Sequence, residues 1–345
     1  MPSPNNLAVL AAAGSRKTQH IVDCVLSDPS QQVLVTTYTT ENMNQLVDRL
    51  SAGTGLLPKH VTVMTWFTFL LNQCARPYQS AVLNDVGVMR GLNFIGARSR
   101  FIPKTNVQKY YLDSHGDMFR DGVAAFAYEC DQRTGGRVVD RLTEIYDHIY
   151  IDEVQDLAGY DLDLLDLLLK SSTAVTVVGD PRQATFATNN ATKNKQYKGR
   201  GIADWLDERK DICQIEHRLE SYRCNQHICD FADGLFPELP GTISKNMEIT
   251  GHDGVSAITP ADVPAYVEKY DPVILRWDRR TKTQGLDAMN FGQSKGCTFD
   301  RVLIFPTQPI TQYYRNRESE LADGGRFKLY VAVTRAKYSV TFVIP

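Results

Sequence analysis

The stretch AAAGSRKTQ (Ala11–Gln19) follows a short apolar run, Leu7–Leu10, near the start of the chain. An apolar strand, a turn of small residues and a Lys-Thr pair are the parts of a phosphate-binding loop, in which backbone N–H groups and a helix N-terminus face an anion. In such a loop Gly14 permits the tight turn, Lys17 reaches the β- and γ-phosphates of a nucleotide, and Thr18 ligates magnesium. The stretch therefore predicts a nucleotide site in an α/β fold.

Two positions of this stretch depart from the glycine pattern of such loops, Ala11 and Arg16. Alanine is a mild change, whereas a Cβ at position 16 is strained if the backbone there needs a positive φ. Two interpretations stay open. Either the backbone tolerates the Cβ and the guanidinium points outward to a phosphate or an acid, or the loop is strained and binds nucleotide weakly.

The composition is that of a globular protein. The chain has 345 residues, enough for two domains, with 43% hydrophobic and 23% charged residues. No apolar run approaches the ~20 residues that span a bilayer, and the N-terminus lacks the layout of a secretion signal. Seven cysteines without regular spacing fit a reducing compartment. We therefore expect a cytoplasmic protein with no membrane partner.

Neither the net charge nor the cysteines identify a ligand. The net charge of −2 gives no support for nucleic-acid binding, although a local basic groove is compatible with it. The cluster CNQHIC holds Cys224, His227 and Cys229. Structural zinc takes four ligands, so we favour ordinary packing in a helix that begins near Asn225.

The chain alternates apolar strand-like runs with helical stretches, which is typical of parallel sheets flanked by helices. Besides the run before the loop, the expected strands are QQVLVTTY (31–38), VTVMTW (61–66), HIYID (148–152), AVTVVGD (174–180), DPVILRW (271–277), RVLIFP (301–306) and SVTFVIP (339–345). Between about 73 and 140 the pattern loosens, which predicts a mainly helical insertion. The polar segment 186–200 predicts an exposed loop.

The expected strand HIYID ends in the carboxylates Asp152 and Glu153. Beside a phosphate-binding loop, the first acid of such a pair holds Mg²⁺ and the second orients or deprotonates the attacking water. A plain solvated strand end is the alternative. The preceding loop favours the catalytic interpretation.

Taken together, eight segments resemble, in order and spacing, the helicase motifs of the UvrD/PcrA/Rep family of superfamily 1. They are AAAGSRKT, TTYTTENMNQL, TWFTF, IDEVQD, VGDPRQATF, LESYRCNQHI, QSKGCTFDRVLI and LYVAVTRAK. Each motif alone is weak, but the ordered set is specific, and the resemblance covers most of the chain from residue 7 to 345.

The resemblance implies two RecA-like α/β cores with ATP in the cleft between them and a nucleic-acid strand across the top. The first core would comprise 1–72 and 141–211, a helical accessory insertion 73–140, and the second core 212–345. The family's ATP and Mg²⁺ site falls on Gly14, Ser15, Arg16, Lys17, Thr18, Asp152, Glu153, Gln183, Tyr222, Arg223 and Arg335.

The resemblance also implies a role for each of these residues. Thr18 and Asp152 would hold Mg²⁺, and Glu153 would be the base for water. Gln183, Arg223 and Arg335 would contact the γ-phosphate, whose spread charge suits guanidinium donors. Tyr222 would stack on adenine.

Three aromatic residues match the family's stacking platforms for nucleic acid: Tyr38, Trp66 and Phe186. Such platforms bind with weak sequence preference because every base has a π-face. For Trp66 a core helix, TWFTFLL, is the alternative.

The chain also departs from the family's pattern. No glutamine-bearing segment precedes the loop, Gly292 replaces a histidine, and Thr298 replaces a glutamate. The interval 226–292 leaves no room for the family's large second accessory domain. We therefore expect a compact form.

Three functions are compatible with these features. The first is an ATPase that moves along single-stranded DNA, with RNA not excluded. The second, by analogy with bacterial anti-phage systems, is a regulatory ATPase that controls a partner such as a nuclease encoded in the same operon. The third is a nucleotide-binding protein without turnover, which the full set of Lys17, Thr18, Asp152, Glu153, Gln183, Arg223 and Arg335 argues against.

Overall fold

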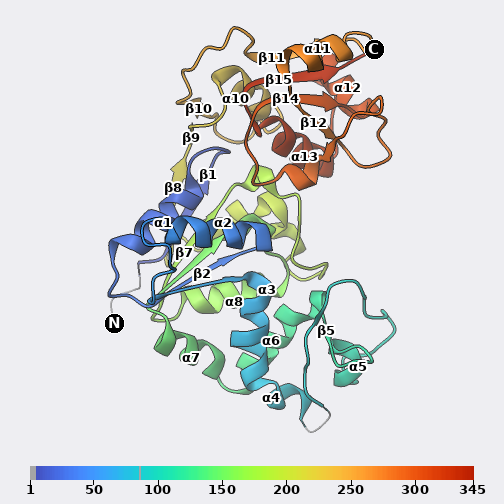
Figure 1. Ribbon diagram of the computed structural model, residues 1–345. Helices are drawn as coiled ribbons and strands as arrows, with labels where there is room; N and C mark the ends of the chain where they lie inside the picture. Colours follow the sequence, from blue (N-terminus) through green and yellow to red (C-terminus); the bar gives the residue numbers. More distant parts are fainter. Residues whose placement is uncertain (1–4, 85–86) are drawn as a thin grey trace. The chain divides into compact units, whose positions relative to one another are not determined.

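The computed structural model describes residues 5–84 and 87–345. By internal contacts the chain forms two compact units (Figure 1). Unit 1 comprises Met1–Leu10, Thr18–Pro181 and Phe186–Glu216, and unit 2 comprises Ala11–Lys17, Arg182–Thr185 and His217–Pro345. The phosphate-binding loop therefore groups with the C-terminal part of the chain.

The first sheet has six strands in the order β3-β2-β6-β7-β1-β8. Their bounds are β1 Leu7–Ala11, β2 Val33–Thr37, β3 Val61–Thr65, β6 His148–Asp152, β7 Ala174–Gly179 and β8 Gln214–Arg218. The pairs of β1 with β7, β2 with β3, β2 with β6 and β6 with β7 are parallel. Strands covered on both faces need continuous apolar runs, which is why the sequence identified these strands.

Helices connect these strands. They are α1 Lys17–Ser27, α2 Thr40–Ser51, α3 Trp66–Phe69 with the π-helical Leu70–Ala75, α6 Val123–Arg133, α7 Arg137–Ile145, α8 Tyr160–Leu169 and α9 Ile202–Asp207. The side chain of Thr39 caps α2 by accepting a hydrogen bond from the backbone N–H of Asn42. The mixed α/β architecture with parallel sheets that the sequence predicted is confirmed.

The segment between α3 and α6 is less regular than the rest of unit 1. It contains α4 Ser80–Leu83, β4 Leu92–Asn93, α5 Val107–Tyr111 and β5 Met118–Phe119, and β4 pairs with β5 in parallel. Tyr111 and Met118 anchor it, because both are buried in the core of unit 1 beside Phe126. We call residues 87–110 of this segment the arm.

The polar segment 186–200 is exposed over most of its length, as its composition predicted, but two of its polar residues are anchored in the interior. Thr188 and Asn189 are buried, and both donate hydrogen bonds to the Asp161 carboxylate of α8. Short 3₁₀ turns follow at Lys195–Tyr197 and Gly199–Gly201. The expectation of exposure fails at these two positions, because their polar side chains satisfy a buried acid.

Unit 2 contains a five-stranded parallel sheet in the order β11-β15-β14-β12-β13. Its strands are β11 Gly254–Ile258, β12 Val273–Arg276, β13 Met289–Asn290, β14 Phe299–Phe305 and β15 Ala336–Val343. Its helices are α10 Gln226–Asp233, α11 Val263–Tyr270, α12 Gln308–Arg315 and α13 Asp323–Val333, and a small parallel pair joins β9 Glu220–Ser221 to β10 Ile243–Ser244. Among the described residues, no helix has the length and apolar character to cross a membrane.

Candidate functional site

The phosphate-binding loop packs tightly against the segment around β9. Gly14 has a φ of 79°, and its carbonyl accepts a hydrogen bond of 2.9 Å from the N–H of Tyr222. A Cβ on Gly14 would lie 2.6 Å from Oγ of Ser221 and 2.7 Å from Cβ of Arg223. Glycine is therefore required at this position by both conformation and close approach.

Arg16 adopts the left-handed conformation in which glycine is favoured, with a φ of 61°. Its guanidinium carbon lies 4.1 Å from the ring centroid of Tyr222, the residue assigned to adenine by resemblance. Tyr222 is 42% exposed, and its hydroxyl donates to Glu220 at 2.9 Å. The guanidinium therefore covers an aromatic ring of the predicted nucleotide site, a partner that neither interpretation of Arg16 considered.

Ser15 supplies an observation that fits a bound phosphate. Its hydroxyl oxygen is buried and has no hydrogen-bond partner among the described residues. Buried hydroxyls without a partner are rare, because an unmade hydrogen bond costs about 1–3 kcal/mol. A phosphate oxygen at the start of α1, which begins at Lys17, would accept from Ser15 and lie at the positive end of the helix.

The predicted magnesium ligands lie together in unit 1. The hydroxyl of Thr18 donates to Oδ2 of Asp152 at 3.4 Å, although 134 positions separate them in the sequence. The other carboxylate oxygen of Asp152 accepts from the N–H of Glu153 at 2.9 Å. Hydroxyl and carboxylate oxygens suit Mg²⁺, which is bound in such sites by one or two protein oxygens together with substrate phosphates. The donor set therefore fits the ion.

Glu153, the predicted base, is held by a network that the sequence reasoning missed. Its φ of 61° lies in the left-handed region, which is rarely occupied by glutamate. The side-chain amide of Gln155 donates to the Glu153 carboxylate, and its oxygen accepts from the N–H of Asp180 at 3.0 Å. A Cβ on Gly179 would lie 2.4 Å from that oxygen. In the sequence, the glutamine of DEVQD and the glycine of VGD were the residues from which this network could have been predicted.

Two predicted γ-phosphate contacts lie together in unit 2. Arg335 is 2% exposed, and its Nη2 donates to Oε1 of Gln183 at 3.3 Å. Its Nε donates to the carbonyl of Val331 at 2.9 Å. Arg223 donates to the carbonyl of Thr334 at 3.0 Å. The two arginines are therefore fixed to the C-terminal end of α13 and the residues after it.

Arg182 and Tyr330 are further residues that the motif assignment left without a role. The hydroxyl of Tyr330 accepts from the N–H of Ala13 at 3.3 Å, and the buried Arg182 lies 5.9 Å from the Tyr330 ring centroid. Arg182 also donates to Oγ1 of Thr242 at 3.1 Å. Tyr330 therefore holds the backbone of the predicted loop at Ala13, and Arg182 fixes the residue next to Gln183. These contacts join residues far apart in the sequence, so no local pattern could have predicted them.

Two of the three predicted stacking residues lie together in unit 1. The rings of Tyr38 and Phe186 are stacked, with centroids 5.7 Å apart and planes at 24°. Phe186 is an exposed residue at the end of its motif. Tyr38 also contacts Phe67, with centroids 5.9 Å apart.

Trp66 does not share this arrangement. It is 1% exposed, and its indole N–H donates to the buried Asp161 carboxylate at 2.8 Å. Burial raises the pKa of Asp161 to about 6, against the hydrogen bonds that it accepts. Since no face of the Trp66 ring is open to a base, the core-helix alternative describes this residue, and we do not carry Trp66 into the nucleic-acid site.

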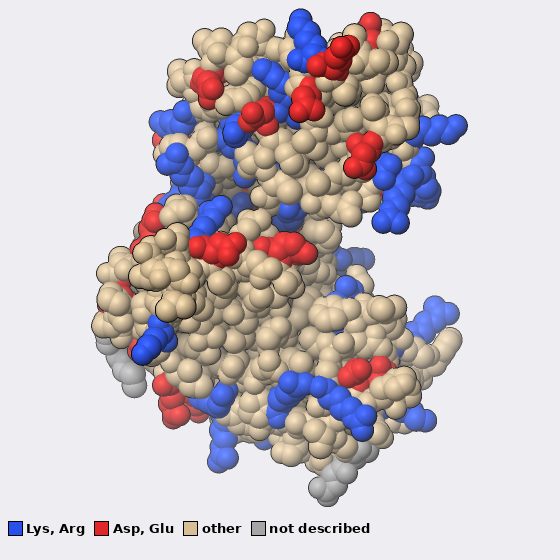
Figure 2. Space-filling view, in the orientation of Figure 1, with Lys and Arg blue, Asp and Glu red and all other residues tan. Residues whose placement is uncertain are grey.

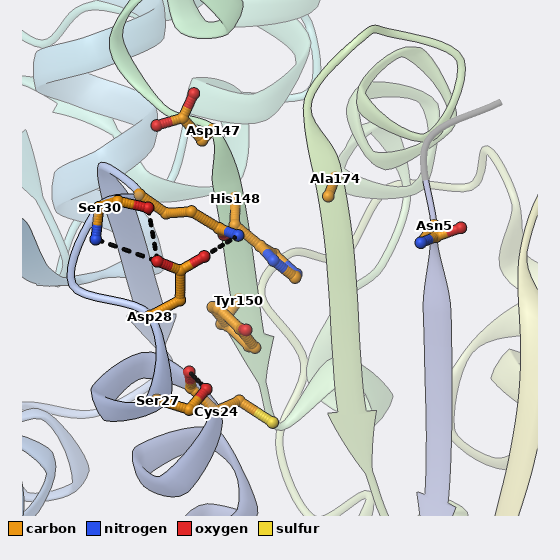
Figure 3. A pocket seen from close by; sticks show the side chains of 10 residues that line it. Asn5, Cys24, Ser27, Asp28, Ser30, Asp147, His148, Tyr150 and Ala174 are labelled. Carbon is orange, nitrogen blue, oxygen red and sulfur yellow. Dashed lines mark hydrogen bonds between the residues drawn. The ribbon is translucent and has the colours of Figure 1, made fainter. Parts of the chain in front are cut away.

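A separate cavity of about 600 Å³ lies in unit 1 at the ends of β6 and β7 where these strands begin (Figure 3). His148 faces it, stacked on Tyr150 with centroids 4.1 Å apart. Burial lowers the pKa of His148 to about 4. The strands of a parallel α/β sheet usually bind ligands at their carboxyl ends, so this opposite end is outside the candidate site.

The CNQHIC cluster has ordinary packing contacts. Asn225 caps α10 by accepting from the N–H of Ile228. The thiol of Cys224 donates to the carbonyl of Thr334, and that of Cys229 to the carbonyl of Cys224. No group of three metal-ligating side chains occurs in the part of the chain that the structure describes.

Comparison with known proteins points to helicases. Residues 118–198 match the UvrD/REP helicase N-terminal domain. ATP-dependent DNA helicase SRS2 of Saccharomyces cerevisiae is 32% identical over 99 residues, which are 26% of this chain and 8% of the yeast protein. This chain therefore spans a small part of that relative.

Solved structures give the same fold. The arterivirus nonstructural protein 10 helicase has a TM-score of 0.51 and 15% identity, covering 98% of this chain and 59% of the viral one. Its complex with DNA has the same score and identity and covers 61% of the viral chain. The predicted resemblance to superfamily 1 helicases of the UvrD type is therefore confirmed, and the sequence match to the UvrD/REP family lies in residues 118–198.

Proposed function

We propose that this protein is an ATPase that uses Mg²⁺ and ATP to move along single-stranded nucleic acid. The contact between Thr18 and Asp152 carries the proposal, because it joins the two predicted metal ligands across 134 positions of sequence. The buried, unpartnered hydroxyl of Ser15 supports it, since a phosphate would satisfy that group.

In this proposal a bound Mg²⁺ would supply positive charge against the charge that develops on the transferred phosphoryl group. Thr18 and Asp152 would hold the ion, and Lys17 would bind the β- and γ-phosphates. Glu153 accepts the proton of the attacking water, and the Gln155 amide fixes the direction of its carboxylate. A general base must first point its carboxylate at the attacking water, and this hydrogen bond fixes that direction.

The γ-phosphate contacts are assigned to Gln183, Arg223 and Arg335. The contact between Arg335 and Gln183 supports a shared role, because an amide and a guanidinium together match the oxygens of a phosphoryl group. Tyr222 provides the platform for adenine once the Arg16 side chain leaves its ring.

For the nucleic acid, Tyr38 and Phe186 provide stacking platforms. The viral helicase structure that contains DNA has the same fold, which supports this class of ligand. We propose DNA over RNA as the ligand because the yeast relative is a DNA helicase.

A regulatory ATPase that controls a partner nuclease is the second candidate. The cover of Arg16 over Tyr222 favours it, because a nucleotide must displace that side chain before it stacks on the ring, which weakens nucleotide binding as a regulated site would. ATP hydrolysis without displacement of a duplex, unless the product of a neighbouring gene is added, would support this candidate.

The proposal is tested by ATP hydrolysis with and without single-stranded DNA. The native chain should hydrolyse ATP, and DNA should raise the rate. Lys17→Ala should abolish hydrolysis and binding of a fluorescent ATP analogue, whereas the matched control Lys59→Ala, at an exposed lysine of unit 1, should retain both. Hydrolysis by Lys17→Ala at the native rate would overturn the assignment of the loop.

A further inference from the structure

The arm, residues 87–110, has a charge unlike that of the whole chain. It contains five basic residues and no acidic one, namely Arg90, Arg98, Arg100, Lys104 and Lys109, whereas the chain has a net charge of −2. Lys and Arg side chains gather over the part of unit 1 that carries α5 and β5 (Figure 2). A local basic segment of this kind attracts phosphate even when the total charge is negative.

The arm also exposes large apolar side chains between its basic residues. Ile95 is fully exposed, Phe101 is 80% exposed and Phe94 is 55% exposed. Contiguous exposed apolar groups mark binding surfaces in soluble proteins. Aromatic rings interleaved with arginines are the combination that binds single-stranded nucleic acid, because rings stack on bases while guanidinium groups contact phosphates.

Phe94 joins the arm to the predicted stacking platforms. Its ring meets that of Phe67 edge to face, with centroids 5.4 Å apart. Phe67 contacts Tyr38, and Tyr38 stacks on Phe186. These four rings form one continuous row within unit 1, which we call the aromatic row, and Phe94 is its end on the arm.

The turn that presents Phe94 is built by Asn93. The side-chain oxygen of Asn93 accepts from the N–H groups of Ile95 at 3.0 Å and Gly96 at 2.6 Å. Its amide donates to Asp113 at 2.8 Å. Pairing of β4 with β5 fixes the same residue from its backbone side. Because the turn is fixed, the Phe94 ring needs little ordering when it binds.

We propose that the arm is a nucleic-acid contact of this chain, in which Phe94 stacks on a base of a single strand and Arg98 and Arg100 contact its phosphates. The proposal rests on the proposed function for the class of ligand. A protein partner is the competing occupant, but five basic residues without an acidic one in the arm favour a polyanion, although Lys104 is paired with Glu129 of α6. Cation–π contacts of Arg98 with Tyr110, at 3.6 Å, and of Arg100 with Phe101, at 5.0 Å, keep both guanidinium groups beside rings.

The first measurement is the binding of fluorescein-labelled oligo(dT) by anisotropy. Phe94→Ala should weaken binding by roughly tenfold, the loss expected for one base–aromatic stack, and Phe94→Trp should restore it. Leu56→Ala removes a 75% exposed apolar side chain elsewhere in unit 1 and should bind as the native chain does.

The second measurement is the salt dependence of the same binding. Replacing both Arg98 and Arg100 by glutamine should reduce the slope of log K against log salt by about 1.4, since each lost phosphate contact changes it by about 0.7 for single strands. Replacing Arg279 and Lys282, two exposed basic residues of unit 2, removes the same charge and should leave the slope unchanged.

The outcomes separate this proposal from the proposed function. If the arm variants bind oligo(dT) and respond to salt as the native chain does, the arm proposal is overturned while the ATPase proposal stands. ATP hydrolysis by a native chain that binds no nucleic acid would overturn the arm and the translocation together. If Phe94→Ala changes only the oligomeric state in sedimentation, the arm is a protein contact and the proposal is wrong.

Discussion

The carboxyl end of β6 and the arm belong to the same unit and differ in almost every physical respect. At the end of β6, Asp152, Glu153 and Gln155 are buried polar groups that hydrogen-bond to one another or to neighbouring backbone. In the arm, Phe94 and Ile95 are apolar and exposed. The first region fixes the direction of a few atoms, as a chemical step requires. The second offers surface, as binding of a long ligand requires.

The largest expected effect breaks chemistry without affecting binding. Glu153→Gln keeps the size of the side chain but removes the base, so ATP hydrolysis should fall by about 10²–10⁴-fold. Oligo(dT) affinity should stay within about twofold of the native value, because the arm is unchanged. Steady-state ATPase assays and anisotropy measure the two effects.

The matched control for this variant is Glu144→Gln, at an exposed glutamate of α7. It should hydrolyse ATP at the native rate. An unchanged rate of ATP hydrolysis in Glu153→Gln would show that another group accepts the proton. The assignment of the chemical step to the end of β6 would then be wrong.

A second prediction concerns pH and buried groups. Because burial lowers the pKa of His148 from 6.5 to about 4, the fold favours the neutral imidazole, and this stabilisation is lost as the pH falls from 6.5 towards 4. At about 1.4 kcal/mol per pKa unit, the loss is about 3 kcal/mol. His148→Phe, which keeps a ring on Tyr150, should lose correspondingly less stability between pH 7 and pH 4 in urea titrations.

Asp161 has the opposite effect on stability, because burial raises its pKa to about 6. As the pH decreases, the folded state takes up this proton first, and the free energy of unfolding rises. The measurement is therefore the difference between His148→Phe and the native chain at each pH, in which the contribution of Asp161 cancels. Parallel stability curves would show that His148 titrates normally in the fold.

A third prediction compares the stability of the two regions directly. Gln155→Ala leaves the N–H of Asp180 without its acceptor and should lower the free energy of unfolding by about 2 kcal/mol. Arg100→Gln, at an exposed arm residue, should change it by less than about 0.5 kcal/mol. Chemical denaturation followed by circular dichroism tests both, and equal losses would contradict the contrast.

The smallest effect concerns Arg16. Arg16→Ala and Arg16→Gly both remove the contact with Tyr222, but only glycine relieves the positive φ. Arg16→Gly should therefore be more stable than Arg16→Ala by roughly 1 kcal/mol. Equal stabilities would show that the left-handed backbone costs nothing at this position.

The sequence predicted the strands well because each central strand is a continuous apolar run. HIYID and AVTVVG, for example, became β6 and β7. The sequence did not predict β8, Gln214–Arg218, because its residues are mostly polar. This strand lies at the edge of the first sheet, where its side chains are less buried than those of the central strands.

For the candidate site, local motifs in the sequence were enough to predict a phosphate-binding loop and an acid pair. The burial of Trp66 depends on Asp161, 95 positions away, and the end of the aromatic row depends on a contact between Phe67 and Phe94. Such contacts arise only when the chain folds, so no local pattern in the sequence could reveal them.

The stack of Arg16 on Tyr222 has a consequence for selectivity between ligands. An exposed cation–π contact is worth about 0.5–1 kcal/mol, so the ring is free only part of the time and the apparent dissociation constant of a base that needs it rises about three- to sixfold. Pyrophosphate, which has no base, competes with nothing on that ring. The Arg16 side chain therefore competes weakly with the base for the Tyr222 ring and lowers the affinity for nucleotides but not for pyrophosphate. Its removal should raise the affinity for nucleotides relative to that for pyrophosphate.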